Sequence, residues 1–234
     1  MRPRLPLPRL PGLALASALL LAPTPGSSQM IPSPYRFIES RHDAGFFMGV
    51  LKENRGTLRM GPGGGLVTGG RYGIHATGPL TFEASTFLLV ADREVYAPTS
   101  SGGLQRLGTA DSYVGSAELL VRLTVTGSRT WHGLAPFLLA GAGLIGDFAG
   151  PSDLESEFRA GERYDFGPAV IGTLGAGTRW YLTDRVSLRL DGVFHLWRLK
   201  TPRSFLQQVT ELGPLEEHEW PGIVGIVGGV NLGF

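Results

Sequence analysis

The sequence predicts an all-β fold: one up-and-down barrel of eight antiparallel strands that crosses a membrane. Three observations support this prediction. Eight extended segments are separated by turn-rich links, the links alternate in length, and the last segment ends on an aromatic residue, Phe234. An unpaired strand edge is very costly in lipid, so the last strand must find a partner, and the first strand is the natural one.

Each of the eight segments is extended in character and is bounded by clusters of Gly, Pro, Asp, Ser or Thr. We place the strands at residues 44–51, 65–76, 80–90, 112–125, 135–148, 166–182, 186–199 and 222–234. One short helical turn is expected around residues 205–209, and no other stretch has a convincing helical period.

The links between the strands alternate between long and short. The long links are residues 52–64, 91–111, 149–165 and 200–221, and the short links are residues 77–79, 126–134 and 183–185. Antiparallel neighbours reverse direction, so all the long links fall at one end of the barrel. Short periplasmic turns and longer external loops are typical of outer-membrane barrels, which places both termini in the periplasm.

The first 28 residues have the three parts of a secretory signal peptide. Three arginines precede an apolar stretch at residues 13–22, and a small, polar stretch follows at residues 23–28. The apolar stretch is far shorter than the roughly 20 residues that a spanning helix needs. We therefore divide the chain into a signal peptide (1–28), a periplasmic lead-in (29–43) and an outer-membrane barrel domain (44–234).

The composition excludes several classes of function. Without the first 28 residues the chain has 18 basic and 20 acidic residues, so its charge does not favour binding to nucleic acid. It contains no Cys, so it forms no disulfide and carries no lipid on a cysteine. Its 35 glycines follow no collagen period, and an apolar content of 42% argues against disorder. The glycines are therefore expected inside regular structure.

The strands are two-faced, and their pattern alone does not say which face is inside. In the seventh segment, Leu188 and Leu190 share one face, whereas Arg189 and Asp191 share the other. A soluble, lipocalin-like barrel would turn the apolar face inward, whereas a membrane barrel turns it toward lipid.

Three features favour the membrane barrel. The polar faces carry many small residues, such as Gly175 and Gly177, which a narrow lumen requires. The only two lysines, Lys52 and Lys200, lie where a strand enters a long link, whereas a soluble surface usually carries many. Aromatic residues gather at both strand ends, as expected at two membrane interfaces: Phe82, Phe137, Trp180 and Phe234 near the short links, and Tyr113, Phe166, Trp197 and Trp220 near the long links.

The chain resembles the small eight-stranded outer-membrane barrels, namely the OmpA-type transmembrane domain and the OmpX-like proteins. The pattern Gly228, Val230, Leu232, Phe234 is similar to the signal that such barrels present to the barrel assembly machinery. The resemblance implies a bacterial outer-membrane location and contact with outer-membrane lipids and lipopolysaccharide, and we expect a monomer. No peptidoglycan-binding domain follows the last strand, so a role in tethering the cell wall is not implied.

Charged side chains are predicted to fill the lumen. Seven of them fall on polar strand faces: Arg71, Glu83, Glu118, Arg122, Arg179, Arg189 and Asp191. Counting across the link 77–79 sets Arg71 roughly opposite Glu83. Counting across the link 183–185 sets Arg179 near Arg189, so Asp191 or Glu118 is needed between them. An eight-stranded barrel is just wide enough for side chains to fill, so these charges must neutralise one another.

No catalytic, cofactor or metal site is predicted. Ser187, Asp191 and His195 share one strand face, but each step of four residues spans roughly 13 Å, so these three form no catalytic relay. The glycines of the sequence G-x-G-x-x-G at residues 141–146 match a dinucleotide motif, but no helix follows to hold a pyrophosphate.

Two groups of acidic residues occur in the long links: Asp153, Glu155 and Glu157, and then Glu216, Glu217 and Glu219 around His218. We interpret them as solvated loop charges rather than a divalent-cation site, because their spacing matches no ligand pattern.

The function expected from the sequence is a structural or surface-recognition role through the external loops, which such a barrel is free to vary. Two alternatives remain open. One is a lipid-modifying enzyme with its site at the barrel rim, which would need His195 and Ser or acidic groups from different strands to converge. The other is a narrow channel for small solutes, which would need a water path past the arginines.

Overall fold

The computed structural model describes residues 33–52, 54–56, 59–99, 104–158, 163, 166–202, 206 and 216–234. The chain divides into two units, Met1–Ser33 and Pro34–Phe234, and nearly all described residues belong to the second. The predicted signal peptide and the greater part of the predicted turn at 205–209 lie outside the described residues. Among the described residues, no helix has the length and apolar character that a membrane span requires.

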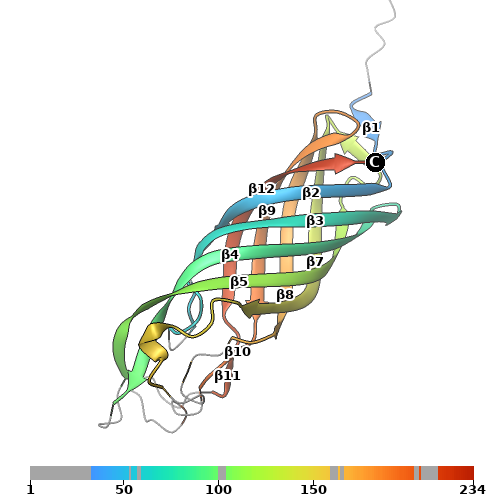
Figure 1. Cartoon of the computed structure of the whole chain (residues 1–234). Coiled ribbons are helices and arrows are strands. Elements are labelled where there is room, and N and C mark those ends of the chain that lie inside the picture. The colour runs from blue at the N-terminus through green and yellow to red at the C-terminus, as the bar shows by residue number, and fades with distance from the viewer. Residues whose placement is uncertain are drawn as a thin grey trace, which may run out of the picture. The chain divides into compact units, whose positions relative to one another are not determined.

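Eight long strands in the described part of the chain form a closed antiparallel barrel (Figure 1). They are β2 (His42–Leu51), β3 (Gly65–Thr77), β4 (Leu80–Pro98), β5 (Leu104–Thr124), β7 (Leu134–Asp147), β8 (Ala169–Tyr181), β9 (Val186–Trp197) and β12 (Gly222–Gly233). The last strand, β12, pairs with the first, β2, from Gly225 opposite Leu51 to Gly233 opposite Asp43. The predicted eight-stranded antiparallel barrel is thereby confirmed.

Short elements complete the second unit. The strand β1 (Tyr35–Phe37) pairs with β6 (Arg129–Trp131), which lies between β5 and β7. At the opposite end, β10 (Leu199–Lys200) pairs with β11 (His218–Glu219), and one turn of 3-10 helix, η2, covers Asp153–Glu155.

The two ends of the barrel differ, and we name them by their connections. The turn end carries β1 and the C-terminus, together with the connections 78–79, 125–133 and 182–185 (Figure 1). The loop end carries the longer connections, with β10, β11 and η2. The predicted alternation holds with one difference, because most of the predicted link 91–111 is strand.

That difference makes the β4–β5 hairpin the longest in the barrel. Its pairing continues beyond Val90 opposite Tyr113 to Pro98 opposite Leu104, with one register shift after Val95. The sequence there reads as a loop because it carries Gly, Thr, Asp and Ser. A hairpin outside lipid needs no continuous apolar face, so this segment lacks the pattern on which the strand prediction relied.

The apolar strand faces point outward. Leu119, Leu190 and Leu232 are 74%, 55% and 55% exposed, whereas Arg122 and Arg189 are buried. A barrel with apolar side chains outside and charged side chains inside has the pattern of a membrane barrel, not of a soluble lipocalin-like one.

Inward-facing glycines make room for the large side chains of the lumen. A Cβ atom at Gly177 would lie 2.7 Å from Phe137 Cζ, and one at Gly229 would lie 2.9 Å from Phe47 Cβ. Both distances are shorter than van der Waals contact. The small residues predicted on the polar faces therefore sit beside the bulky lumen residues of neighbouring strands.

Candidate functional site: the filled lumen

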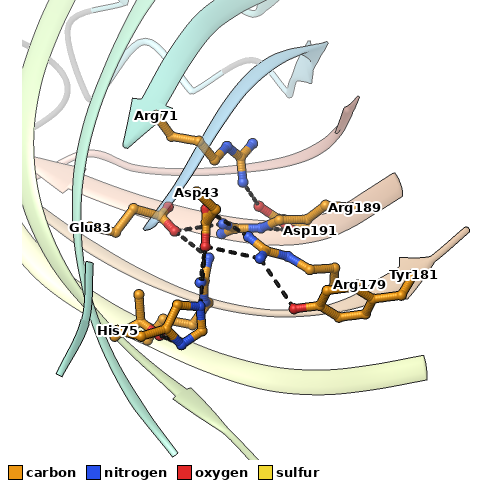
Figure 2. Close-up of polar contacts among 10 residues, drawn as sticks. Asp43, Arg71, His75, Glu83, Arg179, Tyr181, Arg189 and Asp191 are labelled. Atoms are coloured by element: carbon orange, nitrogen blue, oxygen red, sulfur yellow. Dashed lines mark hydrogen bonds and ion pairs between the residues drawn. The ribbon is translucent and has the colours of Figure 1, made fainter. Parts of the chain in front are cut away.

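A cluster of ion pairs fills the half of the lumen nearer the turn end, and its centre is Asp43 on β2 (Figure 2). Arg179 Nη1 and Nη2 donate to the two oxygens of Asp43, each at 2.9 Å. Arg122 Nη2 donates to Asp43 Oδ2 at 2.8 Å, and His75 Nε2 lies 3.5 Å from the same oxygen. One carboxylate thus accepts hydrogen bonds from two guanidinium groups, on β5 and β8.

Glu83 and Asp191 extend the cluster to the remaining arginines. Arg122 and Arg189 donate to Glu83 Oε2 at 2.7 and 2.6 Å. Arg189 Nε also donates to Asp191 Oδ1 at 2.8 Å, and Arg71 donates to Asp191 Oδ2 at 2.6 Å. Every member is buried, so each charge depends on its partners rather than on water.

Six of the seven predicted lumen charges lie in this cluster, and one does not. Glu118 is buried but forms no described ion pair, because its partners are Ser116 and Thr173. Asp43 was missed, because the first strand was predicted to begin one residue after it. A start at His42 would have placed its carboxylate on the same face as Phe47 and Leu51.

The predicted register is right for Arg179 and Arg189 and is two residues off for Arg71 and Glu83. Arg179 stands directly opposite Arg189, as expected. Arg71 stands opposite Ser85 rather than Glu83, because Gly73 is the residue that pairs with Glu83. The β3–β4 turn contains Gly78 in a left-handed conformation and a register shift after His75, which counting along the chain does not reveal.

Aromatic rings lie beneath the guanidinium groups. Arg189 lies 4.5 Å from the ring centroid of Phe137, and Arg71 lies 4.3 Å from that of Phe47. A guanidinium over an aromatic face gains electrostatic attraction. Phe137 is 2% exposed, so its predicted place among the membrane-interface aromatics is wrong.

A smaller polar layer lies next along the lumen. Thr173 Oγ1 donates to Glu118 and lies 2.8 Å from His195 Nδ1, and Ser116 Oγ donates to Glu118 at 2.9 Å. A histidine, a hydroxyl and a carboxylate from three strands therefore converge, as an enzymatic site would require. All four side chains are buried within the barrel rather than at its rim, where a lipid substrate would have to approach.

An apolar layer closes the half of the lumen nearer the loop end. Its buried residues include Phe47, Leu51, Val67, Phe87, Leu89, Val114, Ile145, Phe166, Ile171, Trp197, Ile223 and Val227. Trp197 and Phe166 are buried here, so their predicted places at the membrane interface are also wrong. Trp197 ends β9 and follows its inward alternation. Phe166 lies before β8 and packs against Trp197, with the ring centroids 6.3 Å apart.

The other predicted interface aromatics are exposed. Phe82, Trp180 and Phe234 lie toward the turn end, and Tyr113 and Trp220 lie toward the loop end. Phe234 is also held to the first strand, because its N–H donates to His42 O at 3.0 Å and its ring stacks on the His42 ring. Val230, Leu232 and Phe234 of the predicted assembly signal face outward, and Gly228 is half-buried.

Little empty space remains inside the barrel. One cavity among the described lumen residues, between Glu118, His195 and Asp191, has a volume of about 30 Å³, enough for about two water molecules. Larger hollows of about 1070 and 590 Å³ lie along the outer wall, where small side chains such as Ala84 and Ala117 separate bulky ones. They belong to the lipid-facing surface rather than to a path through the lumen.

Ion pairs also fix the segments of the loop end. Arg93 on β4 donates two hydrogen bonds to Glu155 of η2, at 2.9 and 2.5 Å, and both side chains are buried. Ser152 begins η2 and forms a capping box with Glu155. The prediction that Glu155 is a solvated loop charge is therefore wrong. Within the described residues, no group of His, Asp and Glu is arranged to hold a metal ion.

Further contacts stiffen the hairpin that carries Arg93. Arg55 donates to Asp92 at 3.0 Å, and Gly63 N–H donates to Asp92 O at 2.8 Å. The hydroxyl of Tyr96 donates to Glu94 at 2.5 Å, and this bond lowers the pKa of Glu94 below its usual value. The β4–β5 extension is thus an ordered structure rather than a loop.

The glycines at 141–146 lie on β7, and the chain continues through residues 148–152 to the three-residue η2. A helix of that length offers no dipole for a pyrophosphate. The Ser187, Asp191 and His195 side chains also stay apart in their contacts, since Asp191 binds two arginines and His195 binds Thr173.

No protein-family model matches the chain, and no curated protein sequence matches it either. Its fold is similar to several solved structures. Neisserial surface protein A is 12% identical with a TM-score of 0.48, over 86% of this chain and 98% of that chain. Outer membrane protein OprG of Pseudomonas aeruginosa is 13% identical with a TM-score of 0.46, over 83% and 97%. The N-terminal β-barrel domain of OprF from the same organism is 13% identical with a TM-score of 0.38, over 81% and 98%. At these values the likeness concerns the fold alone.

Proposed function

We propose that this chain is an integral protein of the bacterial outer membrane, with a structural or surface-recognition role. Its barrel anchors the protein, and its loop end faces the exterior. The observation that carries this proposal is the filling of the lumen by an ion-pair cluster and an apolar layer, which leaves a cavity of about 30 Å³ between Glu118, His195 and Asp191.

The architecture of the loop end supports the recognition role. The β4–β5 hairpin continues past the barrel wall, and the Arg93 to Glu155 and Arg55 to Asp92 pairs hold neighbouring segments against it. A surface that is ordered before it meets a partner loses less conformational entropy on binding. The outward apolar belt supports membrane insertion, and an outward loop end agrees with the asymmetry of outer-membrane barrels.

Planar-bilayer recording tests the proposal against the channel alternative. The purified full chain, inserted into a planar bilayer, is expected to show no steady conductance of porin size. Fractionated cells are expected to show the chain in the outer membrane, as a band whose gel mobility changes on heating. A stable open channel, or a soluble periplasmic band, would contradict the proposal.

A further inference from the structure

The two lysines of the chain, 148 positions apart in sequence, both lie next to the segment that leads from β11 into β12 at the loop end. Lys52 follows β2, and its N–H donates to Val224 O of β12 at 2.7 Å. Lys200 ends β10 and stands opposite His218 of β11, the short strand that leads into β12. Both lysines therefore lie beside the segment 218–224.

These lysines belong to an exposed basic patch, which we define as Lys52, Arg198, Lys200, His218 and Trp220. The side chains of Leu51 and Leu199 are buried, so the alternation of the strands turns Lys52, Arg198 and Lys200 outward, and all three are exposed. One step along the register from Leu199 and Glu219 sets Arg198 opposite Trp220, which is 52% exposed. Arg198 Nη2 lies 2.7 Å from His218 Nε2.

The patch lies where the apolar belt ends. Val50 of β2, Phe194 of β9 and Val224 of β12 are outward residues near the loop-end limits of those strands, and each is exposed. Lysine and arginine place their aliphatic stems on apolar surface while the charged groups reach toward water. Tryptophan is typical of the same interface. The patch therefore lies at the level where lipid head groups meet the barrel.

The positive charges of the patch have no acidic partner among the described residues. Glu219 faces the other side of its strand, near Gly56. Glu216 and Glu217 lie farther from the belt, where their carbonyl groups accept hydrogen bonds from Thr201. Three arginines of the neighbouring hairpin region do pair with acids: Arg55 with Asp92, Arg93 with Glu155 and Arg106 with Glu94. Three cations at a lipid interface remain available to an anionic ligand.

We propose that this patch binds the phosphate groups of a phosphorylated glycolipid of the outer leaflet, namely the lipid A part of lipopolysaccharide. The proposal rests on the outer-membrane location proposed above. The patch favours a lipid over a free phosphate ion, because its charges border the apolar belt on which acyl chains lie. Lysine serves this purpose as a compact charge on a flexible stem, whereas the paired, fixed cations of the lumen are all arginines.

The test is lipid binding by the full chain in nanodiscs of uncharged phospholipid, with lipid A or dephosphorylated lipid A added in steps and counted by native mass spectrometry. The triple variant Lys52→Gln, Arg198→Gln, Lys200→Gln is expected to lose affinity for lipid A by about fivefold for each charge removed. A matched control removes three other exposed arginines, as Arg41→Gln, Arg106→Gln and Arg185→Gln, and is expected to bind as the unchanged chain does.

Each result separates the proposal from another explanation. Equal binding by the triple variant and the unchanged chain would overturn it, and so would equal loss in the control, which would indicate non-specific attraction. Equal affinity for dephosphorylated lipid A, or displacement of lipid A by millimolar inorganic phosphate, would also overturn the assignment to a phosphorylated lipid. Heat-dependent gel mobility and cell fractionation of the same variants test the barrel and its location separately.

Discussion

Asp43 is the residue on which the charge balance of the lumen depends most directly. It accepts both hydrogen bonds of Arg179 and one from Arg122, and its side chain is almost fully buried. Replacing a well-packed ion cluster by apolar residues can be neutral, whereas removing one partner leaves a buried charge uncompensated. Loss of this single carboxylate therefore leaves Arg179 without its acidic partner and leaves Arg122 with Glu83 alone.

We expect Asp43→Asn to lower the free energy of unfolding by about 3 to 5 kcal/mol, the range for a broken buried ion pair. The measurement is urea unfolding of the refolded chain in lipid vesicles. Asp92→Asn is the matched control, because Asp92 pairs with Arg55 but its side chain is half exposed, and a pair of that kind contributes about 0 to 1 kcal/mol. Equal losses for the two variants would show that Asp43 is not a buried hub.

At the same scale, alternation predicted the positions of the lumen arginines but not their partners. Arg122 and Arg189 were expected inside because their neighbours on both sides are apolar and face out. Their acceptors depend on which side chains meet across the barrel, and Asp43 lies 79 and 136 positions from the two arginines it binds. No local sequence pattern predicts a contact between residues so far apart in the sequence.

Among the elements, the β4–β5 hairpin departs most from the prediction. Strand positions inside the barrel were predicted to within a few residues, because lipid on one side and a filled lumen on the other impose a strict alternation. Beyond Val90 and Tyr113 that constraint ends. The hairpin continues because β4 and β5 pair with each other and because Arg93 and Val95 are buried at the loop end.

The contact between this hairpin and η2 leads to a prediction about local stability. Glu155→Gln removes the charge that Arg93 binds, so we expect residues 92–96 to open more often, and their amide hydrogens to exchange on the order of 100-fold faster. Hydrogen-exchange mass spectrometry of the chain in nanodiscs measures this. Glu157→Gln, a neighbouring exposed residue, is the control. Exchange in the barrel strands β8 and β9 is expected to stay unchanged in both variants, and a uniform increase across the barrel would contradict a local role.

At the scale of the whole barrel, two chemically different layers close the lumen, each at a different depth. The ion-pair cluster closes the part nearer the turn end, and the apolar layer around Phe87 and Trp197 closes the part nearer the loop end. Neither layer depends on the other for its contacts, apart from shared packing at Phe47.

We therefore expect that opening one layer alone leaves the barrel non-conducting. The double variant Arg179→Ala, Arg189→Ala removes two large side chains from the ion-pair cluster. The double variant Phe87→Ala, Trp197→Ala removes two from the apolar layer. In single-channel recording, each double variant is expected to show no conductance above that of the bilayer alone. The variant with all four substitutions is expected to show a measurable conductance. Heat-dependent gel mobility confirms that each variant has folded. Conductance from either pair alone would show that one layer is the true barrier.

The pairing of β1 with β6 has a mechanical consequence. β6 precedes β7, and β7 is separated from β2 by β3, β4 and β5 around the wall, so residues 38–41 run from one side of the ring to a distant one. This segment therefore crosses the opening of the barrel at its turn end. A barrel that is linked across its opening in this way resists flattening into an oval at the turn end. A segment fused ahead of Tyr35 would leave the barrel beside β6, not beside β2, although β2 is the next strand in the chain.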